Sequence, residues 1–202
     1  PTRRQRQMCI RDRLLSAIKW IGKAIHLIAD NNISDLSIYG VGVANNGGGT
    51  DGQEYTFPAI SVNAGQHILL ARDSAAMHAY LGSGCYSNFD HVIVATSSIS
   101  QNGDDAIELF FNGSVIETFG DVNVDGTGQP WEYLDSWAYK DSLGSWTYGG
   151  VNCTDGSTSS QTSNCPYPIC PPIVVQNINI TLEVNTANTV SYTHLTLPTS
   201  RS

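Results

Sequence analysis

The sequence lacks several features that would assign it to a familiar functional class. No apolar run approaches the roughly 20 residues that a membrane-spanning helix needs. The hydrolase and protease signatures G-x-S-x-G and H-E-x-x-H, the P-loop, and a G-x-G-x-x-G that opens a helix are all missing. We therefore predict a chain with no membrane span and no catalytic centre of its own.

Basic residues are scarce except at the N-terminus, where residues 1–13 read PTRRQRQMCIRDR. One alternative is a basic arm that binds nucleic acid. However, MCIRDR (8–13) is what the transposon end used in sequencing-library preparation encodes in one frame. VSYTHL (190–195) is the same DNA end read from the opposite strand. We therefore predict that residues 1–13 and 190–202 are adapter-derived read-through, to be set aside in any fold argument.

Between these ends, residues 14–189 hold four lysines and arginines against 17 aspartates and glutamates, a net charge of −13. So acidic a surface repels nucleic acid and anionic membranes. It suits a salty extracellular medium or the binding of cations. We expect no direct nucleic acid binding by this chain.

Four cysteines lie outside the predicted adapter segments: Cys85, Cys153, Cys165 and Cys170. In an acidic chain rich in Gly and Asn they favour disulfides and an oxidising compartment. They can pair in three ways, and we prefer Cys153–Cys165, which closes a polar loop. Zinc is the competing interpretation, but the spacings contain no C-x-x-C.

Gly and Asn punctuate short apolar runs, a pattern typical of a chain rich in strands. One segment, 73–81, predicts a helix, with Asp73 or Ser74 as its cap and Gly82 as its stop. Within it we expect Met77 and Tyr80 to pack on the body and His78 to lie at the surface. Strands are expected at 23–28, 36–43, 66–71, 91–95, 106–111 and 114–119, and a short extended piece broken by Pro58 is expected at 55–60.

Asn112-Gly113 is the strongest hairpin signal, because it suits a two-residue type I′ turn. The register that follows places Glu108 opposite Glu117, a like-charge pair that must be solvated or bridged by a cation. Asp104 and Asp105 at the hairpin entrance, near Glu108, could form paired catalytic carboxylates. Solvated turn residues are the commoner role for such positions.

Residues 121–132, DVNVDGTGQPWE, match the calcium-loop pattern D-x-[DN]-x-[DN]-G-x5-E. Alternate Asp and Asn oxygens converge when Gly lets the loop turn, which predicts a calcium site at Asp121, Asn123, Asp125 and Glu132. A preceding strand and Pro130 differ from the usual setting of such loops. The alternative is an acidic turn whose side chains bond their own backbone.

Aromatic residues follow in pairs spaced two apart, so that each pair shares one face of a strand. Core packing is one use for them, and stacking on sugars is the other. The second use makes a carbohydrate-binding module an alternative function. It needs a flat exposed set of Trp131, Trp137 and Trp146. The pairs are Trp131 and Tyr133, Trp137 and Tyr139, and Trp146 and Tyr148.

Residues 103–140, GDDAIELFFNGSVIETFGDVNVDGTGQPWEYLDSWAYK, resemble the lamin-tail domain in its bacterial secreted form. KAIHL (23–27), DLSIYGVGVANNG (35–47), SWTYGGVNCTDG (145–156) and SNCPYPIC (163–170) extend the resemblance to about residues 22–170. His26 departs from the family, whose members usually carry Glu there. The resemblance implies an all-β, immunoglobulin-like β-sandwich with one short helix and no catalytic residues.

The same resemblance implies a module of a larger secreted or cell-surface bacterial protein, which binds or tethers. Such modules often accompany extracellular nucleases, phosphatases or other hydrolases, so a role as the accessory part of such an enzyme stays open. We expect an extracellular location and a protein or polysaccharide ligand. We assign residues 14–170 to this domain, and 171–189 to a proline-rich linker with the first strand of a following domain.

Overall fold

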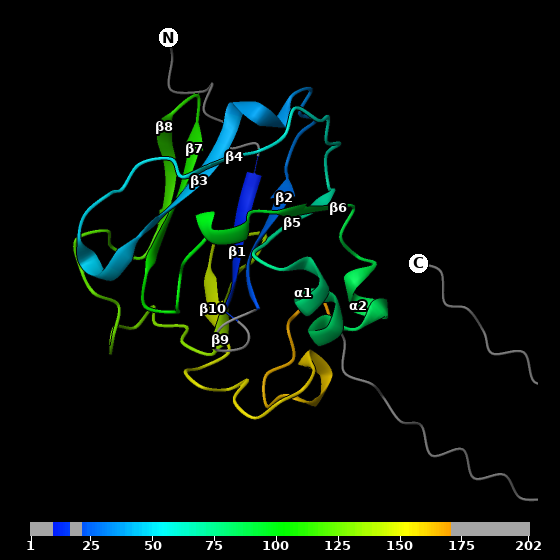
Figure 1. Cartoon of the computed structure of the whole chain (residues 1–202), viewed down its shortest axis with the longest axis vertical. Coiled ribbons are helices and arrows are strands. Elements are labelled where there is room, and N and C mark those ends of the chain that lie inside the picture. Colours follow the sequence, from blue (N-terminus) through cyan, green and yellow to red (C-terminus); the bar gives the residue numbers. More distant parts are fainter. Residues whose placement is uncertain (1–9, 17–21, 171–202) are drawn as a thin grey trace, which may run out of the picture.

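A computed structural model describes residues 10–16 and 22–170 and places ten strands in two sheets (Figure 1). Neighbouring strands are antiparallel, except for the parallel pair β5 and β6. The six-stranded sheet has the order β10 (Trp146–Tyr148), β9 (Ser136–Lys140), β1 (Ile10–Ser16), β2 (Lys23–Ala29), β5 (His67–Ala71), β6 (His91–Val94). The four-stranded sheet has the order β4 (Tyr55–Thr56), β3 (Tyr39–Ala44), β7 (Ala106–Phe111), β8 (Ser114–Phe119).

Alternating side chains of both sheets meet in one apolar core. Ile25 and Leu27 of β2 join Val41 and Val43 of β3, because every second residue of a strand faces the same side. Phe119 at the end of β8 closes this core, with its ring 5.4 Å from that of Tyr133. The prediction of an all-β fold is confirmed at this level.

The opposite face of the six-stranded sheet carries a second apolar cluster, which contains Leu69, Met77 and Trp137. Two short helices, α1 (Ser74–Leu81) and α2 (Ser83–Tyr86), lie beside this face, and β3, β7 and β8 lie on the other side (Figure 1). The fold thus has two α-helices among its described residues where the sequence predicted one. Four 3-10 turns complete the elements: η1 (Leu36–Ile38), η2 (Asn45–Gly47), η3 (Thr96–Ser98) and η4 (Ser160–Thr162).

Helix α1 begins where its sequence predicts. The Asp73 carboxylate accepts the amides of Ala75 and Ala76, and Gly82 with φ 75° ends the helix. Met77 and Tyr80 are buried while His78 is exposed, as expected. The helix therefore packs its apolar side on the sheet through local signals that sequence alone reveals.

Two disulfides tie the C-terminal part of the described chain to this second cluster. Cys153 and Cys165 are bonded, with Cα atoms 5.7 Å apart, which confirms the preferred pairing. Cys85 of α2 is bonded to Cys170, with Cα atoms 4.9 Å apart. Tyr167 lies in the sequence between Cys165 and Cys170, which belong to different disulfides, and it is buried in the same cluster. The loops of residues 149–170 are thereby held against the helical side of the six-stranded sheet.

The hairpin of β7 and β8 forms at the predicted turn, but its register changes after two residue pairs. Asn112 and Gly113 have φ of 49° and 73°, as a type I′ turn requires, and Phe110 pairs with Val115. A bulge between Leu109 and Phe110 then shifts the ladder by one residue. Glu117 consequently faces Leu109 and Glu108 faces Thr118, so the predicted pair of opposed glutamates is wrong.

Other predicted strands differ in their ends. The short extended piece expected at 55–60 forms the two residues of β4 and ends before Pro58, the residue expected to break it. The strand expected at 36–43 begins with η1, and β3 starts only at Tyr39. Trp131 and Tyr133 lie between β8 and β9, outside any strand.

Strand β1 crosses the boundary predicted between residues 13 and 14 and pairs with both β2 and β9. Strand pairing uses backbone groups that any sequence supplies, so the adapter origin of residues 1–13 stays a prediction. The predicted linker and strand at 171–189 and the second adapter segment at 190–202 lie outside the described residues. Within the described residues, no helix combines the length and apolarity needed to cross a bilayer.

Candidate functional site: the acidic loop end

Three loops meet at one end of the four-stranded sheet: residues 45–54 after β3, residues 102–105 before β7, and residues 120–132 after β8. The antiparallel order brings these strand ends together. The Gly49 amide donates to Val122 O at 2.8 Å, and the Gly126 amide donates to Asp104 O at 2.9 Å. Gly47 lies so close to the backbone of Asp125 that a Cβ would sit 2.5 Å from its nitrogen. We call this region the acidic loop end.

Two buried carboxylates hold the loops from inside. Asp105 accepts the amide of Asn46 at 2.9 Å and that of Asn102 at 2.9 Å. Glu108 is also buried and accepts the hydroxyl of Thr50. The expectation that Asp105 is a solvated turn residue is therefore wrong, because both of its oxygens serve as backbone anchors.

Burial raises the pKa of Asp105, while the Asn46 and Asn102 amides act in the opposite direction. Burial has the opposite effect on a basic group: it lowers the pKa of Lys23, and the charge of Arg72 adds to this effect. The Lys23 ammonium donates to Ser100 O, close to the acidic loops. These two groups take structural roles, since each is bound to a neighbouring segment.

The carboxylates of residues 120–132 take part in turns of their own. Asp121 accepts the amide of Asn123 at 2.9 Å, and Asp125 accepts that of Thr127 at 2.9 Å. Glu132 accepts the amide of Gly128 at 2.7 Å. The Thr127 amide and hydroxyl lower the pKa of Asp125. These bonds match the acidic-turn alternative, in which each side chain caps its own backbone.

The predicted calcium ligands Asp121, Asn123, Asp125 and Glu132 all belong to this loop. Within residues 22–170, no group of three or more His, Cys, Asp or Glu side chains comes together in a way that could hold a metal ion. Each of the three carboxylates uses one oxygen to accept a backbone amide of the loop. Calcium binding therefore stays a prediction of the sequence pattern.

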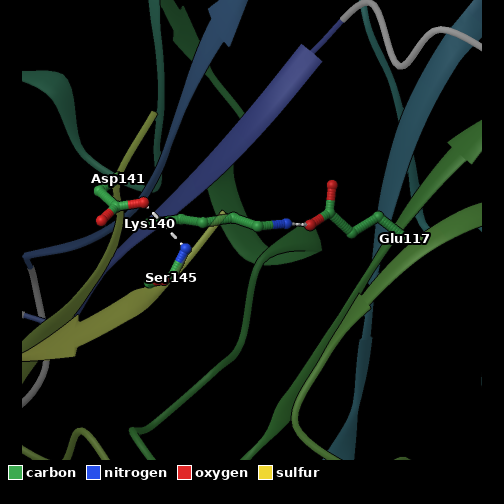
Figure 2. Close-up of polar contacts among 4 residues, drawn as sticks. All are labelled: Glu117, Lys140, Asp141 and Ser145. Atoms are coloured by element: carbon green, nitrogen blue, oxygen red, sulfur yellow. Dashed lines mark hydrogen bonds and ion pairs between the residues drawn. The ribbon is translucent and has the colours of Figure 1, made fainter. Parts of the chain in front are cut away.

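Glu117, which the altered register moves away from Glu108, forms an ion pair with Lys140 of β9. Figure 2 shows the Lys140 side chain directed at Glu117, with Asp141 turned back to the Ser145 amide. The Lys140 ammonium also lies 5.5 Å from the centre of the Trp146 ring. Because β8 and β9 belong to different sheets, this pair links the sheets beside the acidic loop end.

The aromatic pairs are used mainly in packing. Trp137 is buried in the second cluster and donates its indole N–H to Cys165 O at 2.8 Å. Trp131 and Trp146 are half-buried on the first core, at steep angles to the Phe119 ring. The flat exposed set of Trp131, Trp137 and Trp146 that a sugar platform needs is therefore absent from this structure.

Sequence reasoning missed a buried polar chain through His26. Its Nδ1 lies 2.9 Å from the Tyr167 hydroxyl, and its Nε2 lies 2.9 Å from Nδ1 of His67. His26 is fully buried, stacks on His67 and meets the edge of Phe89. The alternation of β2 predicts that His26 lies on the face of the strand opposite to that of Ile25 and Leu27. Its partner Tyr167 is 141 residues away, so no local pattern indicates the contact.

No protein-family model matches the chain, and neither the curated proteins nor the solved structures provide a match.

Proposed function

We propose that the chain is a non-catalytic binding or adhesion module of a larger secreted or cell-surface protein, and that it meets a cationic ligand at its acidic loop end. The observation that carries this proposal is that the buried and the exposed carboxylates of this region have different roles. Asp105 and Glu108 are buried and fix the loops, whereas Asp51, Asp121 and Asp125 are exposed around them. A rigid frame that presents charged loops is a common basis for recognition.

The lamin-tail resemblance supports this proposal. The stretch that carries it, 103–140, contributes β7, β8 and β9, and the upstream phrases cover most of β2 and all of β3. Two sheets around a shared core, with loops gathered at one end, are what an immunoglobulin-like sandwich of this family would have. We accordingly propose the immunoglobulin-like type as the finer description of the fold.

The cysteines support an extracellular location as part of this proposal. Disulfides persist in oxidising compartments and are rare in reducing ones. The Cys85–Cys170 and Cys153–Cys165 bonds fit such a compartment, as does the excess of acidic residues.

The ligand-binding proposal can be tested with four aspartates that all accept the amide two residues ahead. Asp121 and Asp125 lie at the acidic loop end, whereas Asp35 precedes β3 at the opposite end of the four-stranded sheet and Asp73 caps α1. Asn can replace Asp as a cap, so both double variants lose the same charge and keep their turns.

The probe is a short polylysine peptide, with its affinity for the full chain measured by fluorescence anisotropy at low and physiological salt. Asp121→Asn/Asp125→Asn is expected to weaken binding at least tenfold more than Asp35→Asn/Asp73→Asn. Equal weakening by the two double variants would show that net charge alone is responsible, and would contradict a ligand face at the loops.

The non-catalytic part of the proposal needs its own assay. The purified chain should release no product from p-nitrophenyl esters, p-nitrophenyl phosphate or a DNA duplex above the rate in buffer. Turnover that is lost in Asp104→Asn, at the entrance of β7, would assign the carboxylates a catalytic role instead.

A further inference from the structure

Strand β6 is an open edge of the six-stranded sheet. Among the described residues it pairs with β5 alone, in a register that sets Val92 beside Leu69 and Val94 beside Ala71. Leu69 and Ala71 face the second apolar cluster, so Val92 and Val94 lie on that same face. Yet Val92 is 37% exposed and Val94 is 47% exposed. An apolar edge strand with unpaired backbone groups is a template for a further strand.

The described chain ends close to this edge. The Cys85–Cys170 disulfide fixes residue 170 against α2, which immediately precedes β6. The Asn88 side-chain amide donates to Ile169 O at 3.0 Å, and three residues after Asn88 the chain enters β6. Cys170 therefore lies near the start of β6, on the side of the sheet where Val92 and Val94 are exposed.

The sequence that follows has the alternation of a strand with one apolar face. Residues 174–184 read VVQNINITLEV and lie outside the described residues. Ile178, Ile180, Leu182 and Val184 alternate with polar residues. The three residues 171–173 can span at most about 10 Å, which is enough to turn from Cys170 onto a neighbouring edge.

We propose that residues 174–184 cover β6 as a seventh strand of the six-stranded sheet, parallel to β6, with Ile178 and Ile180 packed on Val92 and Val94. The parallel direction follows from the exit point, because the segment begins at the end of the sheet where β6 begins. The segment then completes this domain, and is not the first strand of a following one. This inference concerns the edge opposite β10 and does not depend on the nature of the ligand.

Amide hydrogen exchange, followed by NMR on the full 202-residue chain, tests the pairing. The Ala95 amide donates inward to Ala71 O at 2.9 Å, so the alternation of a strand turns the amides of Val92 and Val94 toward the open edge. We expect these two amides to exchange at least tenfold more slowly than in Ile180→Asn/Leu182→Asn. The matched variant Asn179→Ser/Thr181→Ser changes only the polar face and should leave their exchange unchanged.

The amide of Leu27, in the middle of the sheet, reports whether the apolar-face variant remains folded. As a second measurement that needs no substitution, methyl NOEs should connect Val92 and Val94 with Ile178 and Ile180 in the unaltered chain. The proposal is overturned if these NOEs are missing, or if the amides of Val92 and Val94 exchange as fast as in an unstructured peptide. Protection that rises with protein concentration would also overturn it, because a second copy would then be covering the edge.

Discussion

At the residue scale, polar side chains inside the fold connect segments that are far apart in the sequence. His26 of β2 contacts Tyr167 near the C-terminal end of the described chain, and Asp105 contacts Asn46 across the acidic loop end. A buried hydrogen bond contributes little net stability, but breaking one leaves a polar atom without a partner at a larger cost. Such residues should therefore respond strongly to small changes.

Tyr167→Phe removes the hydroxyl that lies beside His26 Nδ1 and leaves that buried nitrogen without this partner. We expect the free energy of unfolding to fall by about 1–3 kcal/mol in urea denaturation. Tyr55→Phe is the control, because Tyr55 packs its half-buried ring on the core and its change should cost less than about 0.5 kcal/mol. A loss no larger for Tyr167→Phe than for the control would show that the His26 contact adds no stability.

Tyr133 makes the stability of the fold sensitive to alkaline pH. Complete burial raises the pKa of its hydroxyl well above the usual value, with smaller contributions from the charges of Asp105 and Asp104. In the unfolded chain the hydroxyl loses its proton near pH 10. Above that pH the folded state binds more protons than the unfolded state, so the stabilisation present below pH 10 is lost as the pH rises.

Tyr133→Phe should therefore make the free energy of unfolding fall less steeply above pH 10, by up to about 1.4 kcal/mol per pH unit. Tyr55→Phe should change the slope less, because partial burial raises the pKa of Tyr55 to a smaller extent. The measurement is a series of urea titrations between pH 9 and 11.5. Parallel curves for the parent chain and Tyr133→Phe would refute this assignment.

At the scale of elements, local signals located the strands, but contacts between sheets decided their details. Asn112-Gly113 indicated the hairpin and Asp73 the start of α1, since both act within a few residues. The bulge after Leu109 has no such local signal. With this bulge, Glu108 accepts the hydroxyl of Thr50 and Glu117 forms an ion pair with Lys140 of the other sheet. A register predicted from the two hairpin strands alone cannot include these contacts.

The loop after β8 shows the same limit. Its sequence satisfies the calcium pattern at every ligand position, yet its carboxylates cap the amides of Asn123, Thr127 and Gly128. A pattern of residue types specifies the donors and not their convergence, which depends on how residues 45–54 and 102–105 pack against the loop.

The calcium prediction can be tested by isothermal titration and by the melting temperature of the full chain with and without chelator. If calcium binds the loop, saturation at 100 times Kd should stabilise the fold by about 2.7 kcal/mol. Asp125→Asn should abolish the effect, and Asp35→Asn, at the other end of the sheet, should retain it. The absence of both heat and a chelator-dependent shift would end the calcium hypothesis.

At the scale of the whole molecule, two disulfides fasten loops 149–170 to the helical side of the six-stranded sheet. Because a crosslink stabilises mainly by restricting the unfolded chain, the disulfide that closes the longer loop should contribute more to the free energy of unfolding. Cys85 and Cys170 are 85 residues apart, and Cys153 and Cys165 are 12 apart. Sequence spacing suggested the Cys153–Cys165 bond. The Cys85–Cys170 bond has no local signal, because it depends on the fold that brings α2 beside residue 170.

Cys85→Ala/Cys170→Ala should lower the free energy of unfolding by about 4.6 kcal/mol, and Cys153→Ala/Cys165→Ala by about 2.8 kcal/mol. Urea denaturation without reductant measures both, with the unaltered chain as reference. The reverse order of costs, or free thiols in the unaltered chain, would contradict the role assigned to these bonds.

The measurement that tests the proposed function most directly is a map of where a cationic probe contacts the chain. The ¹⁵N-labelled full chain is titrated with a short polylysine peptide at physiological salt, and amide shifts are followed residue by residue. The largest shifts are predicted in residues 45–54, 102–105 and 120–132, around the exposed Asp51, Asp121 and Asp125. Shifts spread evenly over all acidic residues, or centred on α1 and α2, would contradict an acidic loop end that receives the ligand.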